Sequence, residues 1–373
     1  MTAADTVRVA LGARSYDIAV GEDLIATAGK RVRAAIGGRR RAVIVTDRTV
    51  GDLYLAPLRD SLDAAGLRTD AVIVPPGEGS KDFRHFAQLA EDILALGIDR
   101  GTILVALGGG VVGDLTGFAA ATLLRGIDFV QVPTTLLAQV DSSVGGKTGI
   151  NTAHGKNLVG AFHQPLLVLA DIGALDTLPP REIRAGYAEI AKYGLIRDKA
   201  FFDWLDGGAG AALCAGGDRA VRRQAVVHSC RMKAAIVAAD ERETGDQRAL
   251  LNFGHTFGHA LEAETGYSDA LLHGEAVAIG MVQAFRFSAR RGLCTDDDAE
   301  RVARHVGAVG LPVRPPRPNG AALDPGRLLA HMRKDKKVVD GTLTFVLSRG
   351  IGDAFVARDV DAADVQAFLG TQA

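Results

Sequence analysis

The amino-acid sequence predicts a two-domain protein, with an N-terminal α/β domain over residues 1–178 and a mainly α-helical C-terminal domain over residues 179–373. In the first half, short β-branched apolar runs alternate with helical patterns, which is typical of βαβ units in a mostly parallel sheet. After Leu178-Pro179-Pro180 the strand pattern fades and long helical patterns follow. The length of 373 residues also favours two domains or one large one.

The N-terminus alternates like a strand, and the further strands expected in the first domain are residues 42–46, 71–74, 102–107, 129–132 and 166–169. Helical patterns between the first of these strands cover residues 53–65 and 83–96. The helical patterns of the second domain cover residues 181–195, 219–238, 248–264 and 274–291. A proline-rich loop at 311–318 leads to a last short helix, and residues 343–347 resemble a late strand.

Composition limits the possible partners. The formal net charge of −1 does not indicate the excess of basic residues that is typical of proteins that bind nucleic acid. No apolar run approaches the roughly 20 residues that span a bilayer, and the N-terminus lacks a signal-peptide core. Three scattered cysteines, Cys214, Cys230 and Cys294, are typical of reduced thiols. We therefore expect a cytoplasmic protein that binds a small molecule rather than nucleic acid or a membrane.

A glycine-rich turn follows the strand at 102–107. Residues 108–114 read Gly-Gly-Gly-Val-Val-Gly-Asp and open a helix, whose N-terminus and glycine backbone can hold an anion. The turn follows the third strand rather than the first, and no clear acid closes a standard βαβ unit. This favours a dinucleotide site in a Rossmann-like domain of non-standard type, with a simple tight strand-to-helix turn as the alternative.

Other loops at strand ends carry polar residues suited to ligands. Residues 77–81 and Pro133-Thr134-Thr135 both follow strands, where open α/β sheets place their sites. Residues 145–148 read Gly-Gly-Lys-Thr, like the end of a phosphate-binding loop, but Asp141 replaces its leading glycine, which excludes a P-loop ATPase. Because only ten of the 43 basic residues are lysines, Lys147 and Lys156 in glycine-rich segments indicate a phosphorylated substrate.

Three histidines suggest a metal site. His255 and His259 are four residues apart and can share one helix face, and His273 follows. Thr256 stands where a zinc protease needs its glutamate, so the pattern is not that of a peptidase. An open metal site needs three protein ligands, and Glu189 is the best acidic candidate. The alternative for Glu189 is a helical ion pair with Lys192.

These motifs together resemble the 3-dehydroquinate synthase family of sugar-phosphate cyclases, which is related in fold to iron- and zinc-dependent alcohol dehydrogenases. The resemblance runs in order from about residue 42 to 350 and is carried by residues 108–114, 125–126, 133–137, 141–147, 155–157, 189–192, 248–259, 273–275 and 335–337.

The resemblance implies a dehydroquinate synthase-like fold and a lyase of the shikimate pathway, which serves chorismate and aromatic amino-acid biosynthesis. The substrate would be 3-deoxy-arabino-heptulosonate 7-phosphate and the products 3-dehydroquinate and phosphate. NAD⁺ would be used catalytically, for transient oxidation before phosphate elimination, reduction and intramolecular aldol closure. A divalent metal, zinc or cobalt, and a homodimer are also implied.

The resemblance also assigns residues. The implied metal ligands are Glu189, His255 and His273, which leaves His259 as a proton-transfer or substrate group. The implied NAD contacts are Asp47, Glu78, Lys81, Gly109, Gly110, Val111, Val112, Gly113, Asp114, Thr134, Thr135, Lys147, Lys156 and Thr177. The implied substrate and catalytic groups are Asp141, Lys147, Lys156, Asn157, Lys192, Lys233, Arg248, Asn252, His259, Lys336 and, across a dimer interface, Arg125.

Other functions remain open. A sister cyclase would form an inosose, a valiolone or an amino analogue of dehydroquinate. Arg248 would bind a carboxylate that inosose and valiolone precursors lack, so it favours the dehydroquinate type, whereas the amino analogue stays possible. A simple metal-dependent alcohol dehydrogenase would need fewer cations, and a non-enzymatic NAD-binding protein would need no metal ligands.

Overall fold

The structure is a computed structural model that describes residues 4–335 and 342–372. Its contacts divide the chain into two compact units. The first unit comprises Met1–Pro179 and Arg219–Arg242, and the second comprises Pro180–Asp218 and Glu243–Ala373. No helix within the described ranges combines the length and apolar character that crossing a bilayer requires.

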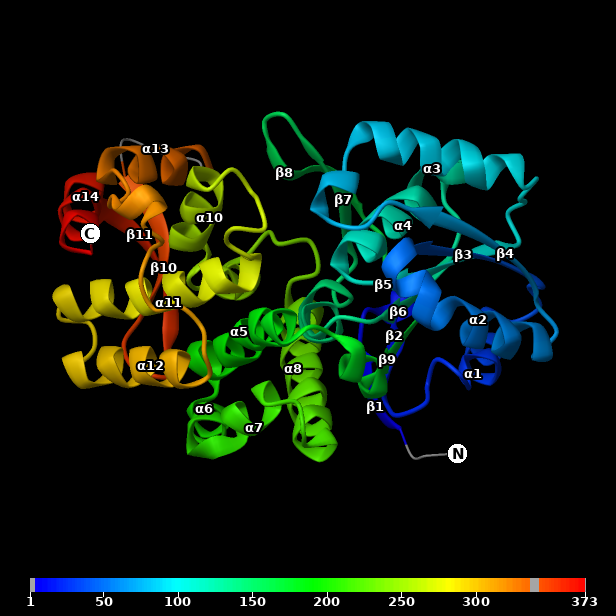
Figure 1. The fold of residues 1–373 in the computed structure, drawn as a ribbon, viewed down its shortest axis with the longest axis horizontal. Helices are drawn as coiled ribbons and strands as arrows, with labels where there is room; N and C mark the ends of the chain where they lie inside the picture. The colour runs from blue at the N-terminus through cyan, green and yellow to red at the C-terminus, as the bar shows by residue number, and fades with distance from the viewer. Residues whose placement is uncertain (1–3, 336–341, 373) are drawn as a thin grey trace. The chain divides into compact units, whose positions relative to one another are not determined.

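The first unit is built on a seven-stranded sheet in the order β1-β2-β9-β6-β5-β3-β4 (Figure 1). Its strands are β1 (Asp5–Val9), β2 (Tyr16–Gly21), β3 (Arg41–Asp47), β4 (Arg68–Val74), β5 (Thr102–Gly108), β6 (Phe129–Pro133) and β9 (Leu167–Asp171). Every neighbouring pair is parallel except β1 with β2. The mostly parallel sheet expected from the apolar runs is confirmed.

Helices cover both faces of this sheet. They are α1 (Ala28–Ile36), α2 (Arg48–Ala64), α3 (Phe83–Ala95) and α4 (Gly110–Thr122). Along β3, Ala42 and Ile44 join one core cluster with residues of α1 and α2. Val43 and Val45 join the opposite cluster with residues of α3 and α4. Successive side chains of a strand point to opposite faces of the sheet, and both faces are covered here, which explains why β3 is apolar from Ala42 to Val45.

One helix departs from the predicted division at residue 178. α8 (Arg219–Ala239) follows the boundary in sequence but belongs to the first unit. Its buried residues Val226, Cys230 and Val237 have no exposed surface, and the Cys230 Sγ–H donates to the carbonyl oxygen of Gln139 at 3.2 Å. The helix therefore buries its apolar face in the first unit, although the chain on either side of it belongs to the second.

A β-hairpin forms where the sequence suggested only glycine-rich loops. β7 (Lys147–Thr152) pairs antiparallel with β8 (Gly155–Phe162). A Cβ atom on Gly149 would lie 2.6 Å from the carbonyl oxygen of Val159, so the two strands approach too closely there for a side chain. The glycines thus serve strand pairing as well as turns.

The second unit is mainly helical, as expected. Its helices are α5 (Pro180–Arg197), α6 (Lys199–Trp204), α7 (Gly210–Cys214), α9 (Asp246–Ala249), α10 (His255–Glu264), α11 (His273–Arg290), α12 (Asp296–Ala308), α13 (Pro325–Asp335) and α14 (Ala362–Thr371). A hairpin of β10 (Thr342–Ser348) and β11 (Ala354–Asp361) completes it. Phe257, Phe287, Phe345 and Phe368 contact one another in its core.

The single helix predicted for residues 248–264 is wrong. α9 and a short 3₁₀ turn (Leu250–Asn252) end before Gly254, which has φ +80° and precedes α10. A Cβ atom on Gly254 would lie 2.8 Å from the amide nitrogen of Met281. Glycine is therefore required both for its left-handed backbone and for its closeness to α11, and His255 becomes the first residue of α10.

A buried hydrogen-bond chain holds α5 and predicts a pH dependence of stability. The Tyr187 hydroxyl lies 2.7 Å from His305 Nε2, and Asp206 lies 3.0 Å from His305 Nδ1. Burial lowers the pKa of His305, so the unfolded chain binds the imidazole proton more readily than the folded protein. The free energy of unfolding should therefore fall as the pH decreases from about 6.5 towards the folded pKa.

Urea unfolding at a series of pH values between about 7.5 and 5 tests this expectation. The His305→Gln variant should show a shallower fall in this window, because glutamine does not titrate. Equal pH dependence in the two proteins would contradict the role given to His305.

Candidate functional site

Three predicted ligands meet within the second unit. Glu189 lies in the middle of α5, while His255 and His273 are the first residues of α10 and α11. One ligand atom from each lies within 4.8 Å of the others. The Nε2 atoms of His255 and His273 are 3.6 Å and 4.0 Å from Glu189 Oε1. The first residues of α10 and α11 thus place two imidazole rings beside the carboxylate of Glu189.

The opposite ring nitrogen of each histidine has its own partner. His255 Nδ1 lies 3.1 Å from the carbonyl oxygen of Phe253, and His273 Nδ1 lies 3.1 Å from Glu262 Oε2. These acceptors favour the tautomer with the proton on Nδ1. The lone pair on each Nε2 is then directed at the region beside Glu189, as in histidines that bind a metal.

The surroundings suit a divalent cation. Glu189 is fully buried, and neither of its carboxylate oxygens accepts a hydrogen bond from the residues that the structure describes. Oε2 forms an ion pair with Lys192, so the predicted helical pair does exist, but Oε1 faces the imidazoles. Burial, followed by the charge of Lys192, lowers the pKa of His255 well below its usual value, which keeps the ring neutral. Neutral imidazoles with a buried carboxylate fit zinc or cobalt.

His259 lies beside this cluster. Its ring centroid is 5.2 Å from that of His255 and 6.0 Å from that of His273. His259, Glu262 and His273 form a second group whose ligand atoms lie within 4.8 Å of one another. His259 therefore lies next to Glu189, His255 and His273, but it is not a member of that group of candidate metal ligands.

Arg248 and Asn252 precede α10 in the second unit. Arg248 lies in α9 and is 1% exposed, and Asn252 ends the 3₁₀ turn that leads to Gly254. Burying a guanidinium without an anionic or hydrogen-bonding partner is unfavourable in free energy. An arginine buried to this extent is therefore typical of one that binds a ligand or holds the structure together. Lys336 lies outside the described residues.

The predicted nucleotide residues of the first unit gather at one edge of its sheet. Asp47, Gly109 and Thr134 lie at the carboxyl ends of β3, β5 and β6, which are neighbours in the sheet. The amide of Thr134 donates to the carbonyl oxygen of Gly108 at 3.0 Å. Thr134 Oγ1 is buried and has no hydrogen-bond partner among the described residues. This edge is where open parallel sheets bind ligands.

The glycine turn leaves little room for side chains. Gly109 precedes α4 as its N-cap. A Cβ atom there would lie 3.0 Å from Thr135 Cγ2, and one on Gly110 would lie 3.0 Å from Ser142 Oγ. The backbone of the first turn of α4, which includes Val111 and Gly113, can thus approach an anion directly. Val112 packs in the core of the first unit, so it can offer a ligand only its backbone.

Charged residues form a buried network in the same unit. Lys81 is 4% exposed, forms an ion pair with Asp114 and donates to Asn157 Oδ1 at 2.5 Å. Asn151 Nδ2 donates to Glu78 Oε1 at 2.7 Å. Burial raises the pKa of Asp114, while the charge of Lys81 opposes that rise. The ammonium group of Lys81 therefore favours the ionised form of the carboxylate, against the effect of burial.

Removing this ammonium group should destabilise the first unit. We expect the Lys81→Met variant to lose about 3–5 kcal/mol of unfolding free energy, because it leaves the Asp114 charge buried without its partner. The Lys81→Met/Asp114→Asn double variant should recover part of that loss. Urea unfolding without added nucleotide checks both values, and a Lys81→Met variant as stable as the unchanged protein would contradict the expectation.

Several predicted residues also have structural partners. Asp47 caps α2 by accepting the Val50 amide at 3.0 Å, and the Thr177 hydroxyl lies 2.7 Å from that of Tyr54. Lys233 Nζ in α8 lies 2.7 Å from Asp141 Oδ1. The structure thus brings Lys233 and Asp141 together.

The positions of Lys147, Lys156 and Arg125 follow from the elements that carry them. Lys147 begins β7 and is exposed, and Lys156 follows at the start of β8. Arg125 lies beyond the C-terminal end of α4, whereas the glycine turn lies at the N-terminal end of that helix. Arg125 is therefore remote from the glycine turn of its own chain.

Two residues in these networks were not assigned to the site from the sequence. Glu262 contacts His273, and Asn151 contacts Glu78 while its Oδ1 accepts the Asn157 amide at 3.0 Å. Glu262 lies three residues after His259, a spacing that places both on one helix face and could have indicated it. Asn151 offered no such signal, because its partners depend on the β7–β8 hairpin.

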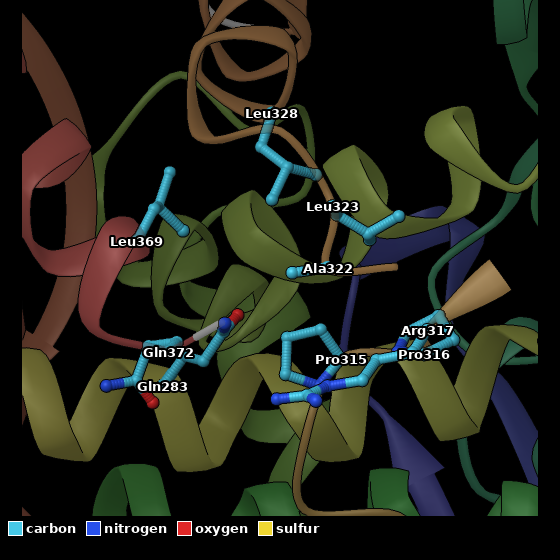
Figure 2. A pocket seen from close by; sticks show the side chains of 9 residues that line it. All are labelled: Gln283, Pro315, Pro316, Arg317, Ala322, Leu323, Leu328, Leu369 and Gln372. Atoms are coloured by element: carbon cyan, nitrogen blue, oxygen red, sulfur yellow. The ribbon is translucent and has the colours of Figure 1, made fainter. Parts of the chain in front are cut away.

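A separate pocket lies elsewhere in the second unit (Figure 2). Leu323, Leu328 and Leu369 line it together with Pro315 and Pro316. None of the predicted site residues lines it, so this pocket is not the candidate site.

Comparisons with known proteins identify related sequences over nearly the whole chain. A family model described as the 3-dehydroquinate synthase N-terminal part matches residues 71–185, and one described as its C-terminal part matches residues 186–338. The 3-dehydroquinate synthase of Caulobacter vibrioides is 58% identical over 98% of this chain and 98% of its own. That of Rhodospirillum rubrum is 59% identical over 97% of this chain and 93% of its own.

Solved structures share the fold. A 2-epi-5-epi-valiolone synthase from Streptomyces hygroscopicus, with NAD⁺ and Zn²⁺ bound, is 32% identical with a TM-score of 0.87, covering 97% of this chain and 98% of its own. A 2-deoxy-scyllo-inosose synthase is 24% identical, also with a TM-score of 0.87, covering 99% of this chain and 100% of its own. The latter likeness concerns the fold alone.

Proposed function

The chain belongs to the 3-dehydroquinate synthase family, and from this membership we propose that it converts 3-deoxy-arabino-heptulosonate 7-phosphate to 3-dehydroquinate and phosphate. The observation that carries the proposal within the molecule is the meeting of Glu189, His255 and His273. Relatives more than half identical over nearly their full length carry the name of this enzyme, which favours it over the sister cyclases.

Two cofactors follow from this proposal. Glu189, His255 and His273 would hold zinc or cobalt, which polarises substrate oxygens and lowers the pKa of bound hydroxyls. The glycine turn, with Asp47, Glu78, Lys81, Asp114, Thr134, Thr135 and Thr177, would hold NAD⁺, which supplies reversible hydride transfer. The orphaned Thr134 hydroxyl and the crowded Gly109 and Gly110 support the second assignment.

The charged residues suit the two anionic groups of the substrate. We assign Arg248 to the carboxylate, because a guanidinium can bind it with two parallel hydrogen bonds. Lys147, Lys156 and Asn157 are assigned to the phosphate, and Lys192, Lys233, Asn252 and Lys336 to the remaining oxygens. His259 and Asp141 are the candidates for proton transfer, since each has a titratable group beside the assigned residues.

We also propose that the enzyme is a cytoplasmic homodimer. Arg125 supports the dimer, because it is exposed and lies at the end of α4 that is remote from the glycine turn of its own chain. In a dimer it can serve the site of the partner. The three free cysteines support a reducing compartment, where disulfides are rare.

Phosphate release from 3-deoxy-arabino-heptulosonate 7-phosphate, assayed with NAD⁺ and zinc or cobalt, tests the function. We expect release that a chelator abolishes and that added metal restores. Sugar phosphates without a carboxylate, the substrate type of inosose and valiolone synthases, provide the comparison. Release from those alone would assign the chain to a sister cyclase and would remove Arg248 from its role.

A further inference from the structure

Glu262 is a buried acid beside the proposed metal ligands. It lies in α10, three residues after His259 and seven after His255, so all three occupy one face of the helix. Glu262 is 2% exposed, and burial of a carboxylate is costly unless polar partners compensate it. The polar contact between Glu262 and His273 therefore helps to compensate the burial of this carboxylate.

That contact fixes one of the two nitrogens of His273. Glu262 Oε2 lies 3.1 Å from Nδ1, whereas Glu189 Oε1 lies 4.0 Å from Nε2 of the same ring. The two carboxylates thus face opposite edges of the imidazole. Because a carboxylate accepts a hydrogen bond, Glu262 selects the tautomer with the proton on Nδ1 and leaves Nε2 as the donor atom for a metal.

We propose that Glu262 is a positioning residue for the metal site, one that orients His273 and strengthens it as a ligand without binding the metal itself. The proposal rests on the metal site of the proposed function. Glu262 also lies in the second group with His259 and His273. However, a single ion cannot use both nitrogens of His273, and Nε2 is the nitrogen directed towards Glu189 and His255.

His273 needs this support more than His255 does. The His255 side chain is 12% exposed, and its Nδ1 faces the backbone carbonyl of Phe253. The His273 side chain is 32% exposed, so less of its orientation is set by packing. The hydrogen bond from Nδ1 to the Glu262 carboxylate therefore helps to fix the orientation of the ring, and we expect its removal to weaken metal binding.

The Glu262→Gln variant tests the proposal, because it keeps the shape and removes the charge. We expect its affinity for zinc, measured by competition with a chromophoric chelator, to fall about 10- to 100-fold. The Co²⁺-loaded variant should keep the visible absorption bands of the unchanged protein, since the ligands are the same. Glu262→Asp, whose shorter carboxylate cannot reach the ring in the same way, should also bind zinc more weakly.

Glu264→Gln is the matched control. Glu264 lies two residues further along α10, and its carboxylate forms ion pairs with Arg327 at 2.8 Å and His331 at 3.1 Å. Its substitution removes an acid whose side chain is 7% exposed from the same helix without removing a partner of His273, so zinc affinity should be unchanged. A similar loss in both variants would mean that helix stability, rather than His273, accounts for the effect, and would overturn the proposal.

Two further results would overturn it. Unchanged zinc affinity in Glu262→Gln would show that the carboxylate does not support His273. Co²⁺ bands altered in position and intensity would show that Glu262 is itself a ligand. Failure of the unchanged protein to bind zinc or Co²⁺ would contradict the metal site of the proposed function itself. This outcome can be told apart from failure of the role given to Glu262, because it is seen before any variant is measured.

Discussion

The His255→Ala variant is expected to lose bound metal and to lower kcat by about 10³-fold. His255 Nε2 lies 3.6 Å from Glu189 Oε1, and its ring is held by the Phe253 carbonyl. Alanine leaves two of the three proposed ligands. Metal polarisation of substrate oxygens contributes several kcal/mol to catalysis, and about 4 kcal/mol corresponds to about 10³-fold in rate.

Metal content after dialysis and phosphate release measure the two effects together. His331→Ala is the control, because His331 pairs with Glu264 and lies outside the predicted site. It should retain its metal. A His255→Ala protein with full metal content and full activity would contradict the assignment of the ligands, provided that its thermal unfolding matches that of the control.

The Arg248→Ala variant should raise KM for the sugar phosphate and lower kcat, with a loss of about 10²- to 10⁴-fold in kcat/KM. Arg248 is 1% exposed. Two hydrogen bonds to a carboxylate, each about 1.5–3 kcal/mol, account for this range. Because the lost contact also orients the substrate, the transition state is affected as well as binding.

Arg248→Lys distinguishes orientation from charge. Lysine keeps the charge and the apolar stem but cannot bind a carboxylate with a planar pair of donors, so most of the loss should persist. KM for NAD⁺ should be unchanged in both variants, and Arg286→Ala, which removes a pairing with Glu300 at 3.5 Å, should leave all constants unchanged. An unaltered kcat/KM in Arg248→Ala would exclude this residue from the site.

The parallel sheet could be predicted from the sequence because its strands are apolar at nearly every position. Val43 and Ile44 face opposite core clusters, and both are fully buried. The location of α8 could not be predicted, because its apolar face is compatible with either unit and only its tertiary contacts place it in the first. The β7–β8 hairpin was missed because Gly149 and Gly160 are typical of loops.

The spacing of His255 and His259 in the sequence was not sufficient to identify the metal ligand. A separation of four residues places His255 and His259 on one face, but it does not tell which of them binds a metal. Gly254 ends the preceding turn and makes His255 the start of α10, and Phe253 then becomes the acceptor for its Nδ1. Gly254 lies close to Met281 of α11, a tertiary contact that no local sequence pattern reveals.

In the proposed phosphate-eliminating cyclase, NAD⁺ acts as a catalyst and is regenerated in each turnover, and the ratio of product to NAD⁺ tests this role most directly. The metal-loaded protein would be supplied with 3-deoxy-arabino-heptulosonate 7-phosphate and substoichiometric NAD⁺. Phosphate and 3-dehydroquinate would be quantified while absorbance at 340 nm is followed. We predict many products for each NAD⁺ and no net NADH. One NADH formed for each substrate consumed would contradict the account and would indicate a simple dehydrogenase.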